Sequence, residues 1–153
     1  PSALHGRPPL WASVDAVRLV LDTNILLAAL ITDGTPPGML FDAWRAGRFT
    51  LISCEQQLDE LREVTRRDRI RDLIRPMEAG RMINDIRAFA AMAAELPAVD
   101  VSPDPYDNYL LALASSGAAD LLVSGDKRGL LALKRFGGTA IVTAREAAQR
   151  VMQ

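Results

Sequence analysis

The chain has 153 residues, 49% hydrophobic and 24% charged, a balance that is typical of one globular domain and excludes a disordered or fibrous protein. Its formal net charge of −1 argues against a protein that coats nucleic acid through bulk electrostatic attraction. Cys54 is the only cysteine and His5 the only histidine, which excludes an internal disulfide and a zinc site of the usual cysteine and histidine kind.

Strands and helices are predicted to alternate along the chain from Val17 onwards. The predicted elements are, in order, a strand at 17–21, helices at 25–31 and 39–46, a strand at 49–52, helices at 54–67 and 76–96, a short strand or extended link at 97–101, a helix at 105–117, a strand at 121–124, a helix at 127–136, a strand at 140–142 and a helix at 143–152. Residues 1–16 are predicted to be an N-terminal extension or a vector-derived remnant before one domain at 17–153, and His5 within them is given no role.

The strands are short and apolar and lack the period-two alternation of a half-exposed sheet. Such strands, separated by helices, predict a parallel sheet that is covered on both faces. We therefore expect an α/β domain of three layers, α/β/α.

Three helix starts carry capping signals. Two have the spacing of a capping box, Ser53 with Gln56 and Thr143 with Glu146. The third is Asp104-Pro105, with an aspartate at the cap and a proline at the first helical position.

Acidic residues follow the predicted strands. Asp22 comes directly after the first strand, Asp126 follows the strand at 121–124, and Asp107 lies in the first turn of a helix. Ligands of open parallel sheets bind beyond the carboxyl ends of the strands, so these three residues are expected at the same edge.

Glu60 is the acid of its helix that is best able to reach inward. On a helical wheel whose core direction is set by Leu58, Leu61 and Val64, Glu60 lies about 100° from the core. Glu55, at about 120°, is a weaker rival, and the other acids of this helix point to solvent.

Each acid also has a purely structural explanation. Asp22 and Asp126 could be helix caps, and Asp107 could complete a capping box or interact with the helix dipole. Four carboxylates at one edge would, however, repel each other unless a cation were bound. Oxygen ligands alone select a hard ion such as Mg²⁺ or Mn²⁺, and such an ion suits phosphodiester hydrolysis.

Four segments stand in order along the chain: Asp22-Thr23-Asn24 after an apolar strand, Ser53 at a strand end followed by Glu60 in Leu-Asp-Glu-Leu, Asp104-Pro105-Tyr106-Asp107-Asn108, and Leu122-Val123-Ser124-Gly125-Asp126-Lys127. In this order they resemble the four motifs of the PIN-domain ribonucleases, a family that includes the VapC-like toxin components of bacterial toxin-antitoxin pairs. The resemblance covers residues 17–152.

The resemblance implies a sheet of about five parallel strands and Mg²⁺- or Mn²⁺-dependent cleavage of single-stranded RNA. It also implies a homodimer and inhibition by a cognate antitoxin. The metal-binding and catalytic residues would be Asp22, Glu60, Asp107 and Asp126, supported by Thr23, Asn24 and Ser124. Asp104 is kept as the helix cap.

An arginine-rich stretch is a candidate RNA contact. Residues 62–81 carry seven arginines against four acids, a formal charge of +3. The possible RNA contacts are Arg66, Arg67, Arg69 and Lys127. The structural alternative is a solvated helical surface.

Two other functions stay open at this stage. One is a non-catalytic module that binds RNA or protein through the arginine stretch, and the other is a hydrolase of small phosphate esters. The second lacks the further aspartate after Asp22 that a phosphoaspartate mechanism would require. No apolar run is long enough to cross a bilayer and the start of the chain is unlike a secretory signal, so a cytoplasmic protein is expected.

Overall fold

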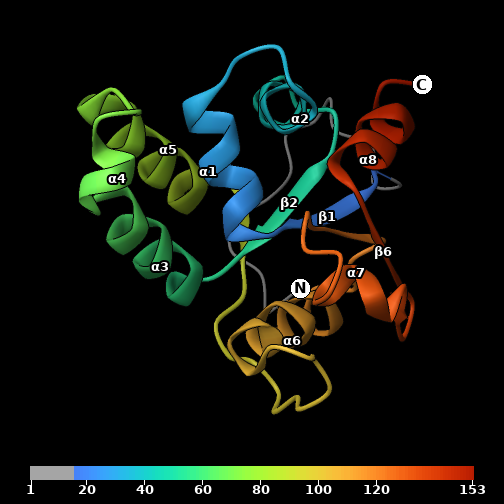
Figure 1. Ribbon diagram of the computed structural model, residues 1–153. Helices are drawn as coiled ribbons and strands as arrows, with labels where there is room; N and C mark the ends of the chain where they lie inside the picture. Colours follow the sequence, from blue (N-terminus) through green and yellow to red (C-terminus); the bar gives the residue numbers. More distant parts are fainter. Residues whose placement is uncertain (1–15) are drawn as a thin grey trace.

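The sheet is organised around β1 (Arg18–Leu21), which pairs in parallel with β2 (Thr50–Ser53) on one side and β4 (Leu121–Val123) on the other. The computed structural model describes residues 16–153, so the predicted extension at 1–16 lies outside it apart from its last residue (Figure 1). The remaining strands are β3 (Ala91–Met92), β5 (Arg135–Phe136) and β6 (Thr139–Val142). Their order is β3-β2-β1-β4-β6-β5, with the first five parallel and β5 antiparallel to β6.

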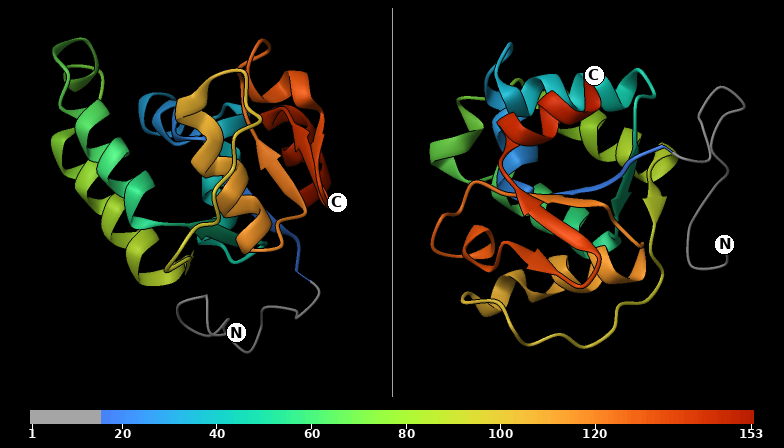
Figure 2. Two further views of the ribbon diagram at one scale, coloured as in Figure 1. Left: turned by 90° about the horizontal axis from the view of Figure 1, so that it is seen from below. Right: turned by 90° about the vertical axis from the view of Figure 1, so that its right-hand side faces the viewer.

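Helices cover both faces of this sheet. They are α1 (Thr23–Ile31), α2 (Pro36–Arg45), α3 (Glu55–Thr65), α4 (Asp68–Arg71), α5 (Pro76–Phe89), the 3₁₀ helix η1 (Pro105–Asp107), α6 (Asn108–Ser116), α7 (Leu130–Leu133) and α8 (Ala144–Val151). Helices α1, α2 and α8 pack on one face, and α6 and α7 lie on the other (Figure 1 and the right view of Figure 2). The predicted α/β/α layering is confirmed. Within residues 16–153, none of the helices has both the length and the apolar character needed to cross a bilayer.

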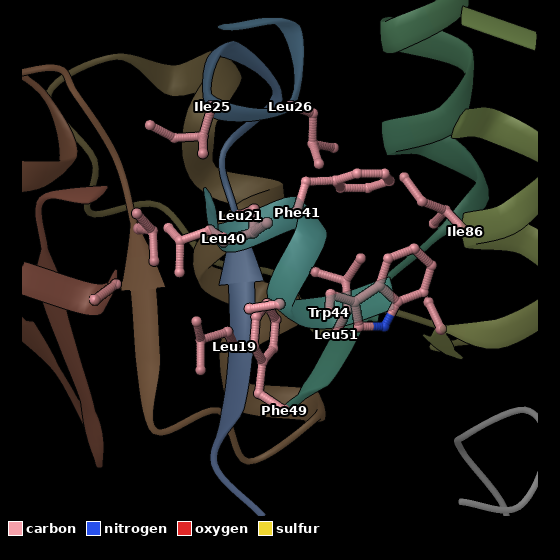
Figure 3. Packing of buried hydrophobic residues seen from close by; sticks show 14 of the residues in the cluster. Leu19, Leu21, Ile25, Leu26, Leu40, Phe41, Trp44, Phe49, Leu51 and Ile86 are labelled. Carbon is pink, nitrogen blue, oxygen red and sulfur yellow. The ribbon is translucent and has the colours of Figure 1, made fainter. Parts of the chain in front are cut away.

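The two faces of β1 explain why its last three residues, Leu19, Val20 and Leu21, are all apolar. Leu19 and Leu21 point into a core under α1, α2 and α8, where they meet Phe41 and Trp44 (Figure 3). Val20 points the other way, into the core beneath α6. All three β1 side chains are fully buried, so neither face of the strand has room for a polar residue.

Helices α3, α4 and α5 form an arm at one side of the molecule, which we call the α3–α5 arm (residues 55–89). Its two long helices run side by side, as the left view of Figure 2 shows. Leu58 and Leu61 of α3 pack with Met82 and Ile86 of α5 in the same core as β1. The arm is therefore anchored in the domain and is not a separate unit.

One predicted cap is wrong and two are confirmed. The N-cap of α3 is Cys54, which makes no side-chain cap, while Ser53 is the buried last residue of β2 and donates its hydroxyl to the Gln57 side chain. The capping box that begins at Thr143 is complete. Asp104 accepts the backbone N–H of Tyr106 at the start of η1, as predicted.

The helix predicted at 76–96 is too long. It ends at Phe89, Ala90 is extended, and β3 then pairs with β2 at the edge of the sheet. The alanine-rich sequence favours a helix locally, but backbone pairing with β2 outweighs that preference. Residues 97–101 form the extended link and no strand.

The helix predicted at 127–136 is wrong over most of its length. Only α7 is helical, and it ends where Lys134 adopts a φ of 60°. The chain then forms β5, turns through Gly137 with a φ of 57°, and returns as β6. The Gly137-Gly138 pair thus belongs to a β-hairpin rather than to a helix end.

A matched pair of glycine substitutions tests the packing of α6 on the sheet. A Cβ at Gly117 would lie 2.8 Å from two carbons of the buried Ile52, so Gly117→Ala is expected to lower the free energy of unfolding by about 1–3 kcal/mol. Gly80 is exposed in α5 with open space around it, so Gly80→Ala is expected to raise stability by up to about 1 kcal/mol. Urea unfolding measures both, and equal effects would contradict the packing described.

Candidate active site

The candidate site lies at the carboxyl ends of β1 and β4. Strands β2 and β3 lie on one side of β1 within the sheet, and β4, β6 and β5 lie on its other side. The order of strands therefore reverses between β1 and β4, which is where open parallel sheets bind their ligands.

Asp22 joins the two strands at this point. Its backbone N–H donates to the carbonyl of Val123 at 2.9 Å, and its Oδ2 accepts the Ser124 hydroxyl at 3.0 Å. Its Oδ1 accepts the backbone N–H of Asn24 at 3.2 Å, so Asp22 is also the N-cap of α1. The side chain is only 5% exposed. The structural explanation of Asp22 as a cap is correct, and it leaves Asp22 at the sheet edge.

Ser124 links Asp22 to Asp126. The backbone N–H of Asp126 donates to the Ser124 oxygen at 3.2 Å. The buried Ser124 hydroxyl therefore contacts both the carboxylate of Asp22 and the backbone of Asp126. The Asp126 Oδ1 accepts the backbone N–H groups of Arg128 and Gly129 at 3.1 and 3.0 Å. A Cβ at Gly129 would collide with the Asp126 carboxylate, so the absence of a side chain there lets the loop close around this acid.

Glu60 reaches the same region from the α3–α5 arm. It is partly buried, whereas the other acids of α3 are exposed, which agrees with its predicted orientation on the wheel. Its rival Glu55 forms an ion pair with Arg87 at 2.9 Å. The Glu60 Oε1 accepts the hydroxyl of Tyr109 at 3.3 Å, and that hydroxyl lies 3.1 Å from the Thr23 Oγ1.

Asp107 completes the group of acids. It is half-buried at the end of η1, and its pKa is raised to about 6, first by burial and then by the charges of neighbouring carboxylates. Those carboxylates are Asp22, Asp104, Asp126 and Glu60. Asp107 therefore lies within electrostatic range of each of the other three predicted acids.

The pKa of Asp22 is also raised. Burial is the largest cause, and the charges of Glu60 and Asp126 add to it, while the hydrogen bonds from Asn24 and Ser124 oppose it. Carboxyl groups that are held together in this way disfavour their own ionisation, which is a property of catalytic and ion-binding sites.

A comparison with protein families matches residues 18–128 of the chain to the PIN domain. The chain belongs to the PIN-domain family. The matched region runs from β1 past Asp126 and so contains all four predicted acids. No curated protein and no solved structure matches the chain.

Membership gives the chain a nuclease fold, because PIN domains are generally nucleases that act on nucleic acids and typically use divalent metal ions. The donor chemistry fits such an ion, since every ligand offered by the predicted acids is an oxygen. Within residues 16–153, no group of three or more His, Cys, Asp or Glu side chains is close enough together, as the side chains stand, to hold a metal ion. Mg²⁺ does not require such a group, because it usually keeps several waters and takes one or two carboxylates from the protein.

The remaining predicted site residues lie in different surroundings. Thr23 is buried and bonded to Tyr109, whereas Asn24 contributes its backbone and exposes its side chain. The predicted RNA contacts Arg66, Arg67 and Arg69 are exposed at the end of α3 and in α4, away from the strand ends (Figure 1). Lys127 is exposed directly after Asp126.

Sequence reasoning missed two residues that order this PIN-domain site. Gln57 is fully buried and donates its amide to the carbonyl of Leu21 at 2.6 Å, which fixes the end of β1 next to Asp22. A glutamine beside Leu58, at the core face of a predicted helix, could have indicated a buried side chain that needs a hydrogen-bond partner. The other is Tyr109, whose position in an apolar helical segment predicts only a packing role for its ring.

The raised pKa of Asp107 predicts a pH-dependent effect of Asp107→Asn on the metal-free protein. The folded pKa lies above the unfolded value of about 3.9, so the contribution of this carboxyl to stability is fully present below pH 4 and is lost as pH rises through 6. After allowance for solvent screening, Asp107→Asn is expected to raise the free energy of unfolding by about 1 kcal/mol at pH 7.5 and to leave it unchanged near pH 3.5.

Urea unfolding in the presence of a chelator measures this difference. Asp100→Asn is the matched control, because Asp100 is exposed and is not among the charges that raise the pKa values of Asp22 and Asp107. A uniform effect of Asp107→Asn at both pH values would contradict the electrostatic account of the site.

Proposed function

We propose that this protein is a metal-dependent endoribonuclease that hydrolyses phosphodiester bonds in single-stranded RNA. The observation that carries the proposal is the electrostatic coupling of four carboxyl groups, those of Asp22, Glu60, Asp107 and Asp126, at the carboxyl edge of a PIN-domain sheet. We assign these four residues to metal binding and catalysis.

The residues of the site favour one kind of cofactor. Four acids that offer oxygen ligands alone suit Mg²⁺ or Mn²⁺, and such an ion, when bound, would supply activation of water and neutralisation of charge on the phosphate. Occupancy would also relieve the repulsion that raises the pKa of Asp107.

The chain's own residues set the geometry of the acids. Asp22 is held by Ser124 and by the backbone of Asn24, and the backbone N–H groups after Asp126 hold that carboxylate. Such pre-ordered ligands lose little freedom when substrate arrives. Thr23, Asn24 and Ser124 are therefore supporting residues.

The arginines of the α3–α5 arm support binding of an RNA backbone. Arg67 is in an exposed ion pair with Glu63 at 3.6 Å, which contributes little, and Arg66 and Arg69 form no ion pair within residues 16–153. Their guanidinium groups are free to contact phosphates. Lys127 would contact the RNA backbone next to Asp126.

A finer assignment belongs to the same proposal. The motif resemblance supports a toxin component of a toxin-antitoxin pair that acts in the cytoplasm as a homodimer and is inhibited by a cognate antitoxin. Co-purification of the chain with the product of a neighbouring gene would test the antitoxin.

Asp22→Asn tests the catalytic assignment. Asparagine is also a good N-cap through its single side-chain oxygen, and its NH₂ group can donate to the Ser124 oxygen in place of the bond that Asp22 accepts. The variant is therefore expected to keep its fold while the rate of RNA cleavage falls at least about 100-fold. Cleavage of mixed single-stranded RNA is followed with Mg²⁺, with Mn²⁺ and with a chelator.

Asp33→Asn is the matched control, since Asp33 is exposed in the turn between α1 and α2. Equal cleavage by wild type and Asp22→Asn would overturn the assignment. RNA binding without cleavage, unaffected by Asp22→Asn or by chelator, would indicate the non-catalytic binding module instead.

A salt titration tests the arm. With both Arg66 and Arg69 changed to Gln, the slope of log K against log salt for single-stranded RNA is expected to flatten by about 1.4, because each phosphate contact contributes about 0.7. Binding is measured in the Asp22→Asn background, where the RNA stays intact. The control changes Arg145 and Arg150 on α8, on the other side of the molecule (Figure 1), and an equal change of slope there would contradict a specific role of the arm.

A further inference from the structure

Tyr109 joins three helices at the candidate active site. It is the second residue of α6, its side chain is 9% exposed, and its hydroxyl lies between Thr23 of α1 and Glu60 of α3. The distances are 3.1 Å to the Thr23 Oγ1 and 3.3 Å to the Glu60 Oε1.

The protons of this bridge have one consistent arrangement. The Tyr109 hydroxyl donates to the Glu60 Oε1, and a phenol has only this one proton to give. Thr23 must then donate its own proton to the Tyr109 oxygen.

Glu60 depends on this bond more than Asp22 and Asp126 depend on theirs. Asp22 accepts two hydrogen bonds and Asp126 accepts two backbone N–H groups, each over a short side chain. Glu60 has a longer side chain, and within residues 16–153 the Tyr109 hydroxyl is its hydrogen-bond donor, with no ion pair. Without that hydroxyl several rotamers become available to Glu60.

We infer that Tyr109 is a positioning residue, whose hydroxyl holds the Glu60 carboxylate in place for the divalent ion and ties it through Thr23 to the turn that carries Asp22. This inference rests on the proposed metal-dependent function. A phenylalanine would fill the same apolar space between α6 and its neighbours, so packing does not account for the buried hydroxyl. Hydrogen bonds of this kind to metal-binding carboxylates raise metal affinity by restricting the ligand.

The test is the affinity for Mn²⁺ by calorimetry, without RNA, for the wild type and Tyr109→Phe. Removal of the hydroxyl is expected to weaken Mn²⁺ binding about 10- to 100-fold, the usual effect of removing such a partner. Tyr106→Phe is the matched control. It removes the hydroxyl of the chain's other tyrosine, three residues away and 86% exposed, and is expected to leave the affinity within twofold.

A double-mutant cycle separates positioning from a structural role. In a Glu60→Ala background, Tyr109→Phe is expected to change the Mn²⁺ affinity less than twofold, because Tyr109 acts through Glu60. Thermal melting of each variant without metal confirms that titrations are made on folded protein. A full 10-fold loss that persists in the Glu60→Ala background would identify a structural effect and overturn the inference.

The outcomes distinguish the inference from the function on which it rests. Wild-type affinity retained by Tyr109→Phe overturns the role of Tyr109 and leaves the metal site in place. No Mn²⁺ or Mg²⁺ binding by the wild type overturns the metal site and the inference together. The inference and the metal site are both supported if Tyr109→Phe weakens Mn²⁺ binding while Tyr106→Phe does not, and if Tyr109→Phe causes no further weakening in the Glu60→Ala background.

Discussion

The parallel pairing of β1 with β4 is the constraint on which the site depends. Leu21 is in register with Val123, so the residues that follow, Asp22 and Ser124, come side by side and form a hydrogen bond. Buried leucines and valines on both faces fix that register. A shift of one residue would exchange the two faces of the strand and carry Asp22 away from Ser124.

The acids at this edge reduce the stability of the metal-free fold. Asp22 is almost fully buried, and the pKa values of Asp22 and Asp107 are raised because their ionised forms are poorly solvated and lie near other negative charges. Two extensive apolar clusters offset this cost. Buried carboxyl groups that lie close together, in a domain with an otherwise ordinary apolar core, are typical of functional sites. This agrees with the nuclease fold of the PIN family.

The acids come from separate parts of the chain, and buried polar side chains connect them. Gln57 links α3 to the end of β1, Ser124 links β4 to α1, and Tyr109 links α6 to α1 and α3. These connections make α3 part of the site wall as well as the base of the α3–α5 arm. In the proposed function, RNA bound at Arg66 would lie at the C-terminal end of the helix that carries Glu60.

The α/β/α class, the parallel sheet and the caps at Asp104 and Thr143 could be predicted from the amino-acid sequence, because apolar patterning and capping are local properties. The same holds for the family membership that the four acidic segments suggest. The tertiary structure alone decided β3 and β5, since an edge strand forms only when a partner such as β2 or β6 is in place. It also decided the bonds of Ser53, Gln57 and Tyr109. Their partners are distant in sequence, or are chosen by burial, so no local pattern specifies which polar atom each buried group will find.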